Sequence, residues 1–190
     1  MSGFNIKNEE GLIATAKNNQ EIFGKLYDFY YPKIFGYIFR LTGDHVLASD
    51  ISSETFLKAW LKIGLFRWRG ISISSWFFKI ATNELNQYYR KKKYTPYLLM
   101  DLSFFEAAVV QNTRYSKDQP NEINIKLEQG EEFMNLHKKL KTLSPDYQKV
   151  IALRYFEEMS IRQISEILGK KENTIKSLLS RGLDKLKILF

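Results

Sequence analysis

The side chains with the clearest capacity for specific chemistry form a polar and basic run near the carboxyl end of the chain. The run follows a break at Gly169-Lys170, and it consists of Lys171, Glu172, Asn173, Thr174, Lys176, Ser177, Ser180 and Arg181. Short donors and acceptors near a helix start suit the base edges of the DNA major groove, and cations further along suit phosphates. From spacing alone, the solvated face of an ordinary two-helix hairpin is the alternative interpretation.

A second cluster combines aromatic rings with cations. A basic run, Arg90 to Lys93, closes a predicted helix, where the helix dipole alone would favour cations. Tyr88 and Tyr89 precede this run, and residues 67–69 are Arg-Trp-Arg. Aromatic faces beside cations are what a protein needs to hold unpaired bases. We expect most of the aromatic side chains here to be buried, with Trp68 and one of the two tyrosines exposed.

Enzyme chemistry finds little support in the sequence. Asp50 and Glu54 share a helix face, but nothing near them in sequence would raise one pKa for acid–base work. The two histidines, His45 and His137, have no ligand partners at metal-binding spacing, and the chain has no cysteine and no Gly-rich phosphate loop. We therefore predict no catalytic residue, no metal, no cofactor and no enzymatic activity.

The elements that must position these side chains are all predicted to be helices, because apolar residues recur at helical spacing and strand-like alternation is scarce. The sequence predicts an all-α fold of two small helical domains joined by a partly apolar, acidic linker. The predicted helices cover residues 11–17, 20–41, 46–63 and 75–90, then a helix that starts at Pro145, and residues 160–168 and 172–189. We expect a kink or break at Pro32 and a loop over residues 67–74.

The last two predicted helices form a helix-turn-helix pattern, since a short Gly-containing turn joins them. The apolar residues of the first predict a face that packs on the second. These residues are Ile161, Ile164, Ile167 and Leu168, opposite Ile175, Leu179, Leu183 and Leu186.

The formal net charge of +8 is unevenly distributed along the 190 residues. Residues 1–93 carry a net +6, residues 94–132 a net −4 and residues 133–190 a net +6. Two basic blocks suggest a polyanionic partner for each domain. The acidic middle also holds an apolar stripe, Leu98, Leu102, Phe105 and Val109, which predicts either packing on a flanking domain or a docking surface for a partner.

Motifs in both basic blocks resemble a known family. Those of the first block are Leu26-Tyr27, Tyr31-Pro32, Leu41-Thr42-Gly43-Asp44, Ala48 to Phe56, Lys58-Ala59-Trp60 and Trp76 to Asn83. Those of the last block are Leu143-Ser144-Pro145, Leu153 to Glu157, Ser160-Ile161, Gln163-Ile164, Asn173 to Ser177 and Ser180-Arg181. In this order they resemble regions 2 and 4 of the extracytoplasmic-function (ECF) sigma factors, over nearly all of the chain outside the linker.

The resemblance implies a promoter-specificity subunit of bacterial RNA polymerase, with core polymerase and promoter DNA as partners. It implies that residues 1–93 form region 2, which binds polymerase and captures the −10 strand, that 94–132 form the linker, and that 133–190 form region 4, which reads the −35 duplex. The polymerase-binding residues would be Asp50, Glu54, Thr55, Phe56 and Trp60. The −10 residues would be Phe66, Arg67, Trp68, Arg69, Asn83, Arg90 and Lys91. The −35 residues would be the polar run 171–181 named above.

Three positions depart from the family pattern. Lys171 is a weak cap, Leu178 stands where an Arg is common, and Ser53 stands where Gln is usual. The linker stripe suggests an anti-sigma factor as a further partner, and we expect a cytoplasmic location, or retention at the membrane by that factor. The alternative function is a helix-turn-helix regulator that binds duplex DNA without polymerase.

Overall fold

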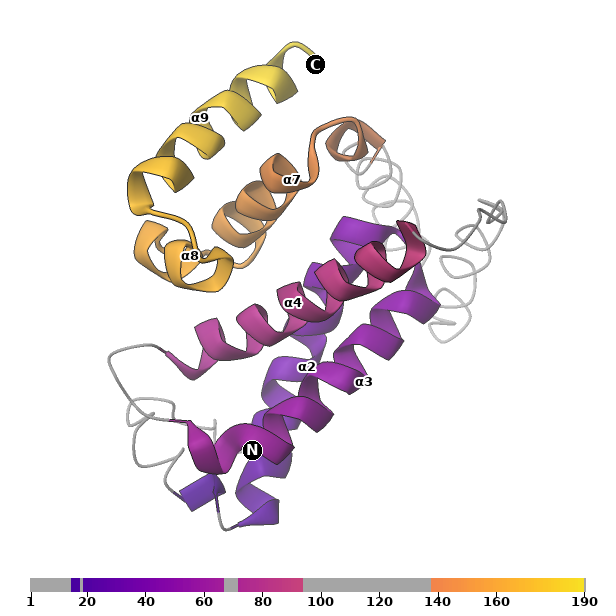
Figure 1. The fold of residues 1–190 in the computed structure, drawn as a ribbon, viewed down its shortest axis with the longest axis vertical. Coiled ribbons are helices and arrows are strands. Elements are labelled where there is room, and N and C mark those ends of the chain that lie inside the picture. Colours follow the sequence, from indigo (N-terminus) through magenta and orange to yellow (C-terminus); the bar gives the residue numbers. More distant parts are fainter. Residues whose placement is uncertain (1–14, 18, 67–71, 94–137, 190) are drawn as a thin grey trace, which may run out of the picture.

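A computed structural model of the chain describes residues 15–17, 19–66, 72–93 and 138–189, and all regular structure in these ranges is helical (Figure 1). The amino-terminal bundle consists of α2 (Gln20–Thr42), α3 (His45–Lys62), the short η2 (Ile63–Leu65) and α4 (Ile73–Lys93). The carboxyl-terminal unit consists of α7 (Pro145–Ile151), η4 (Ala152–Phe156), α8 (Ile161–Leu168) and α9 (Glu172–Lys187). The predicted all-α class is confirmed, whereas the linker stripe at residues 98–109 lies outside the described residues.

Helix α2 begins and ends at residues suited to those positions. Asn19 accepts hydrogen bonds from the amides of Glu21 and Ile22, and Gly43 ends the helix in the left-handed conformation, with φ of 66°. The helix continues through Pro32, so the predicted break does not occur. Pro32 is exposed, and the buried residues on either side of it anchor both halves of the helix in one core.

An aromatic core holds α2, α3 and α4 together. Tyr37, Phe77 and Phe78 are fully buried, and Tyr30 and Phe56 both lie about 5 Å from the Phe77 ring. Burying one such side chain contributes about 1.5–3 kcal/mol, so this cluster contributes substantially to the stability of the bundle.

Two polar contacts cross this bundle and fix its helices relative to one another. The Tyr37 hydroxyl lies 3.0 Å from that of Thr82, which donates to the Phe78 carbonyl, so both buried groups are satisfied. Lys58 on α3 contacts Glu84 on α4 at 2.5 Å and Glu54 on its own helix at 3.1 Å. The hydrogen bond that Lys58 donates to Glu84 is the largest factor that raises the pKa of Lys58.

The carboxyl-terminal unit has the predicted helix-turn-helix. Ser160 and Gln163 form a reciprocal capping box at the start of α8, and Gly169 ends the helix with φ of 64°. Ile164, Ile167, Ile175 and Leu179 are buried between α8 and α9, as expected. The other predicted contact residues, Ile161, Leu168, Leu183 and Leu186, are partly buried.

One element of this unit was not predicted. The helix that starts at Pro145 changes at Ala152 to a π-helical turn, η4, in which the Glu157 amide donates to the Ala152 carbonyl. Glu158 follows with φ of 55°, the left-handed region that a non-glycine residue rarely adopts. These two backbone features turn the chain between α7 and α8 toward α2.

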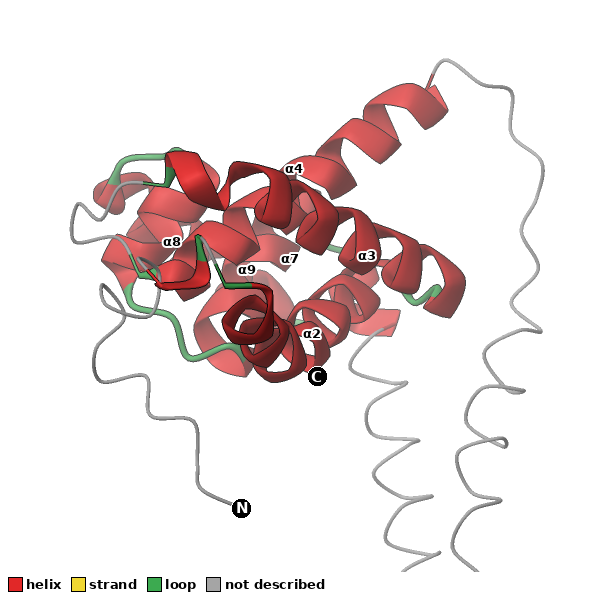
Figure 2. Ribbon diagram, turned by 90° about the horizontal axis from the view of Figure 1, so that it is seen from below, coloured by secondary structure: helices red, strands yellow, loops and turns green. Residues whose placement is uncertain are grey.

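The two helical units contact each other in this structure. Helix α4 lies between the rest of the bundle and α8, and η4 contacts α2 (Figure 1). Viewed from below, the C-terminal turns of α4 project beyond the other helices (Figure 2). No helix in the described part of the chain has the length and apolar character to span a membrane.

The two N-cap serines of the carboxyl-terminal unit make a matched pair for a stability test. Ser160 accepts a hydrogen bond from the Gln163 amide, whereas Ser144 makes no side-chain capping bond. We expect Ser160→Ala to lower the free energy of unfolding by about 1 kcal/mol and Ser144→Ala to change it far less. Urea denaturation followed by circular dichroism measures both, and equal losses would contradict this assignment of the cap.

Candidate nucleic-acid and protein interfaces

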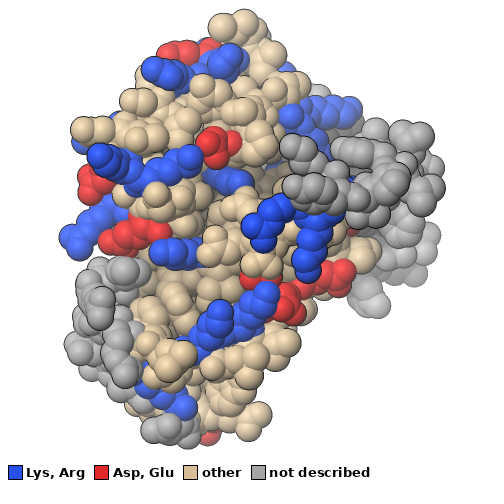
Figure 3. Space-filling view, in the orientation of Figure 1, with Lys and Arg blue, Asp and Glu red and all other residues tan. Residues whose placement is uncertain are grey.

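Helix α9 presents every predicted −35 residue on its uncovered face. Its buried positions are Ile175, Leu179 and Gly182, which face α7 and α8. The exposed residues are Lys171, Glu172, Asn173, Thr174, Lys176, Ser177, Ser180 and Arg181. In the view of Figure 3, Lys and Arg side chains lie over both helical units, with Asp and Glu among them. The polar face is therefore available to a ligand as large as a DNA duplex.

The structure of α9 bears on two of the three departures from the family pattern, those at Lys171 and Leu178. Lys171 occupies the N-cap position and makes no side-chain capping bond, so the expectation of a weak cap is confirmed. Leu178 is partly buried, where it packs against the core of the unit. Its role here is packing, which explains why an apolar residue is accommodated on this helix.

Helix α4 carries the exposed part of the predicted −10 set. Asn83, Arg90 and Lys91 are exposed, and Lys79 shares the stripe that Asn83 and Arg90 form at helical spacing. Sequence reasoning noted Lys79 only as a neighbour of aromatic residues. Its place one turn before Asn83 makes it a further candidate for a phosphate contact.

Of the predicted −10 residues in the loop before α4, the structure describes Phe66. Phe66 is 9% exposed, and its ring packs 4.8 Å from that of Trp76, so it lies in the wall of the bundle. Its carbonyl accepts a hydrogen bond from Lys17 at 2.9 Å. The predicted contacts Arg67, Trp68 and Arg69 lie outside the described residues.

The tyrosines at the end of α4 follow the expectation for this cluster. Tyr89 is 46% exposed, whereas Tyr88 is partly buried, with the Lys92 ammonium 5.6 Å from its ring centre. Phe77 and Phe78 are core residues. Tyr89 is thus the described aromatic side chain placed best to stack on a base beside Arg90.

The predicted polymerase-binding residues divide between the surface and the core of α3. Asp50 is exposed and Glu54 half-buried, while Trp60 is 37% exposed with its ring edge-on to Phe23. Thr55 and Phe56 are buried, and the Thr55 hydroxyl donates to the Ile51 carbonyl. These last two can contribute to the predicted docking face only by holding the helix in place.

Sequence reasoning missed the apolar part of this face. Leu57, Leu61 and Leu65 are 53%, 69% and 76% exposed, and Leu57 and Leu61 lie one turn apart beside Trp60. Ser52 and Thr55 are buried on the opposite face of α3, so small polar residues pack inward while leucines point outward. A prediction that places leucines inward and polar residues outward cannot detect such a face. Adjacent exposed leucines and an aromatic ring mark an interaction surface more clearly than scattered apolar residues do.

These three faces occupy different helices and do not converge on one pocket. Among the residues that the structure describes, no group of three His, Asp or Glu side chains is placed to hold a metal ion. His45 packs edge-on against the Phe35 ring. The geometry offers three separate candidate surfaces, one on each of α3, α4 and α9.

Comparison with known proteins places both units in one family. Residues 26–95 match the Sigma-70 region 2 family, and residues 133–186 match the Sigma-70 region 4 family. The chain is similar to the ECF RNA polymerase sigma factor SigW of Bacillus subtilis, with 30% identity over 90% of each chain. It is also similar to the RNA polymerase sigma factor YlaC of that organism, with 32% identity over 85% of this chain and 88% of YlaC.

Solved structures support the same fold at low identity. CnrH, solved in complex with the cytosolic domain of CnrY, is 19% identical, with a TM-score of 0.68 over 95% of this chain and 96% of CnrH. The sigma factor RpoE of Bartonella quintana, solved in complex with the anti-sigma factor NepR, is 22% identical, with a TM-score of 0.63 over 88% and 95%. Both family matches and the full-length similarity to SigW agree with the exposed α9 face and the mixed α3 face: the chain belongs to the ECF family of RNA polymerase sigma factors.

Proposed function

We propose that this sigma factor directs core RNA polymerase to promoters through three surfaces, one on each of α3, α4 and α9. The observation that carries the proposal is the exposure of the whole polar run of α9 on a helix whose opposite side is buried. In this assignment residues 1–93 serve as region 2, residues 94–132 as the linker and residues 133–190 as region 4. The protein acts by binding and carries out no catalysis of its own.

The −35 element is read by α9. Lys171 to Thr174 lie in the first turn, where short side chains reach base edges, and Lys176 and Arg181 follow at positions suited to phosphates. The Ser177 hydroxyl donates to the Asn173 carbonyl at 3.0 Å, which leaves its oxygen lone pairs to accept from a base or a water molecule.

The −10 element is captured as a single strand along α4. Flipping a base out of the stack costs a few kcal/mol, which stacking and hydrogen bonds in a fitted site can offset. Asn83 supplies donors and an acceptor, Tyr89 a stacking face, and Lys79 and Arg90 the cations for neighbouring phosphates. Phe66 and the segment 67–69 complete the site in this proposal.

Core polymerase binds the outer face of α3. The face combines the carboxylates of Asp50 and Glu54 with the exposed rings and leucines at Leu57, Trp60 and Leu61. Such a face suits a partner helix with basic and apolar residues. Because Lys58 ties α3 to Glu84 of α4, polymerase that docks on α3 also sets the position of the −10 surface.

An anti-sigma factor is the further partner that we propose. Of the solved structures that share this fold, RpoE was determined in complex with the anti-sigma factor NepR, and CnrH in complex with the cytosolic domain of CnrY. A location in the cytoplasm, or at the membrane when the anti-sigma factor is anchored there, fits this role.

Transcription with purified core enzyme tests the proposed function directly. We expect promoter opening, detected by permanganate footprinting of unpaired thymines, only when both the chain and core polymerase are present. Tight, specific binding to an operator by the chain alone, with no strand opening after core enzyme is added, would instead support the polymerase-independent regulator.

The α9 surface is tested by the salt dependence of duplex binding. Lys176→Ala removes one proposed phosphate contact, so it should weaken binding to every duplex sequence and lower the salt slope by about 1. Lys187→Ala removes an exposed cation from the last turn of the same helix and should leave the slope unchanged. Fluorescence anisotropy with a mixed-sequence duplex at several salt concentrations measures this, and equal slopes for the two variants would refute the assignment.

The α3 surface is tested by its most exposed central leucine. Leu57→Asp places a charge on the docking face and should weaken core-polymerase binding by at least about tenfold, or about 1.4 kcal/mol. Its side chain is 53% exposed, so we expect little loss of stability. Ile188→Asp, at a position 84% exposed beyond α9, is the matched control. A pull-down titration that gives both variants wild-type affinity would rule out this face.

A further inference from the structure

Asn83, the proposed base-contacting residue of α4, lies in a deeply buried stretch of that helix. Its neighbours Ala81, Thr82, Glu84 and Leu85 are all buried, so within residues 81–85 only Asn83 is exposed. At about 100° per residue, Thr82 and Glu84 lie on either side of Asn83 around the helix axis. Both are polar, and each contacts a different neighbouring helix.

Thr82 is bonded to α2. Its hydroxyl donates to the Phe78 carbonyl at 2.7 Å, so the Tyr37 hydroxyl, 3.0 Å away, donates to the Thr82 oxygen. Tyr37 is fully buried, and its ring packs edge-on against Phe78 with the ring centres 5.3 Å apart. A close-packed ring has little freedom to follow a movement of α4. This hydrogen bond therefore restrains one side of α4 against α2.

Glu84 is bonded to α3. Its carboxylate accepts a hydrogen bond from the Lys58 ammonium at 2.5 Å, and the Glu84 side chain is only 10% exposed. A buried carboxylate depends on its partner to compensate for lost hydration, so separation of the pair is costly. This ion pair restrains the other side of α4 against α3.

The two bonds restrain α4 in a way that apolar packing does not. Apolar burial is non-directional, so a helix can rotate slightly and keep most of it, whereas hydrogen bonds weaken steeply with a change of angle. With one bond on each side of Asn83, rotation in either direction distorts at least one of them. At the outer radius of a helix, about 6 Å from its axis, a rotation of ~10° moves a side chain by about 1 Å, beyond the roughly 0.5 Å within which a recognition site must be held.

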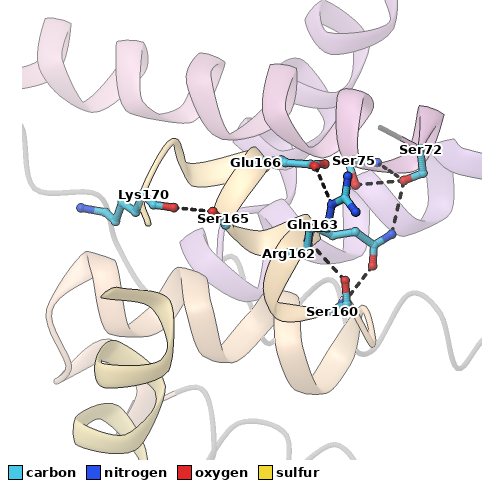
Figure 4. Close-up of polar contacts among 8 residues, drawn as sticks. All are labelled: Ser72, Ser75, Ser160, Arg162, Gln163, Ser165, Glu166 and Lys170. Atoms are coloured by element: carbon cyan, nitrogen blue, oxygen red, sulfur yellow. Dashed lines mark hydrogen bonds and ion pairs between the residues drawn. The ribbon is translucent and has the colours of Figure 1, made fainter. Parts of the chain in front are cut away.

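The polar contacts at the start of α4 differ in character. The Ser72 hydroxyl accepts hydrogen bonds from the Ser75 amide at 3.1 Å and from the Gln163 side chain at 3.3 Å (Figure 4). Ser72 and Gln163 are partly exposed, so water can replace these bonds at small cost. The strongest polar restraints on α4 are thus the buried ones beside Asn83.

We propose that Tyr37, Thr82, Lys58 and Glu84 are positioning residues for recognition of the −10 strand. They set the rotation of α4 about its axis, and so the place of the Asn83 amide against the base that it contacts. The four side chains act through Asn83 and touch no DNA. This inference rests on the proposed function of α4, in which Asn83 contacts the −10 strand.

Two double variants each remove one restraint while keeping the bundle packed. Tyr37→Phe with Thr82→Val removes the hydrogen bond to α2, and Lys58→Met with Glu84→Met removes the ion pair to α3. Replacement of both partners by apolar groups of similar size is nearly neutral for stability, which thermal unfolding followed by circular dichroism checks. If a double variant fails to fold, the single variants Tyr37→Phe and Glu84→Gln replace it.

The matched control is Lys25→Met with Glu21→Met. It makes the same two changes in an exposed ion pair of α2, in which the charged atoms are 2.9 Å apart. We expect it to behave as the wild type. Lys58→Arg keeps the charge beside Glu84 and is the conservative variant. Asn83→Ala, alone and combined with each double variant, identifies the base that Asn83 contacts.

The readout is base preference. A pool of short, randomised single-stranded oligonucleotides is sequenced before and after binding to holoenzyme assembled from core polymerase and each full-length variant. Asn83→Ala should lose the preference at one position. Each double variant should lower the preference at that position by at least about threefold, part of the roughly five- to 150-fold that one good base contact supplies. Neither should lower it further in the Asn83→Ala background, and Lys58→Arg should keep the wild-type preference.

The outcomes separate the positioning role from the role of Asn83 itself. Wild-type preference in both folded double variants would overturn the inference and leave the role of Asn83 intact. A loss spread over all positions, or added to that of Asn83→Ala, would do the same, because it would mark a general structural effect. Wild-type preference at every position in Asn83→Ala would instead refute the proposed contact of Asn83 with the −10 strand, and the positioning role with it.

Discussion

Burial of one face of each helix is the constraint on which the rest of this structure depends. In the amino-terminal bundle, the rings of Tyr37, Phe77 and Phe78 occupy the space between α2 and α4. The buried Thr82 hydroxyl forms a hydrogen bond with the Tyr37 hydroxyl there. Every helix therefore has only its outer face left for recognition. The candidate surfaces of α3, α4 and α9 are therefore outer faces, and buried side chains of the same helices hold them in place.

The sequence predicted the helices and the outward face of α9 well, because helical periodicity and the signals at Ser160 and Gly169 are local properties. It predicted less about the proposed docking face on α3, because the burial of each α3 residue depends on how the neighbouring helix packs. Thr55 and Phe56 share α3 with Asp50, yet Phe77 of α4 covers Phe56, while Leu57 and Leu61 stay exposed. Pro32 favours a break locally, but packing on both sides of it keeps α2 continuous. The contacts between Arg40 and Glu157 link residues 117 positions apart, a separation at which periodicity carries no information.

The buried ion pair between Arg40 and Glu157 contributes orientation more than net stability. Burial raises the pKa of the Glu157 carboxyl, although the nearby Arg40 and Lys33 charges lower it, so desolvation outweighs the attraction. Removal of one partner from such a pair is costly, whereas the intact pair adds little free energy over an apolar contact. The pair therefore fixes the geometry of the contact between η4 and α2 more than it stabilises the fold.

The orientation of the helix-turn-helix relative to α7 depends on the number of residues in the π-helical turn at residues 152–156. Each residue of an α-helix advances the chain by about 100° and 1.5 Å. A π turn contains more residues than an α turn, because its hydrogen bonds join residues five positions apart. Loss of a single residue from this turn would rotate Glu157 by about a quarter-turn around the helix axis, away from Arg40, while the internal packing of α8 on α9 stayed intact. An insertion or deletion at this one place would thus change how the two units contact each other without any change in the residues proposed to contact DNA.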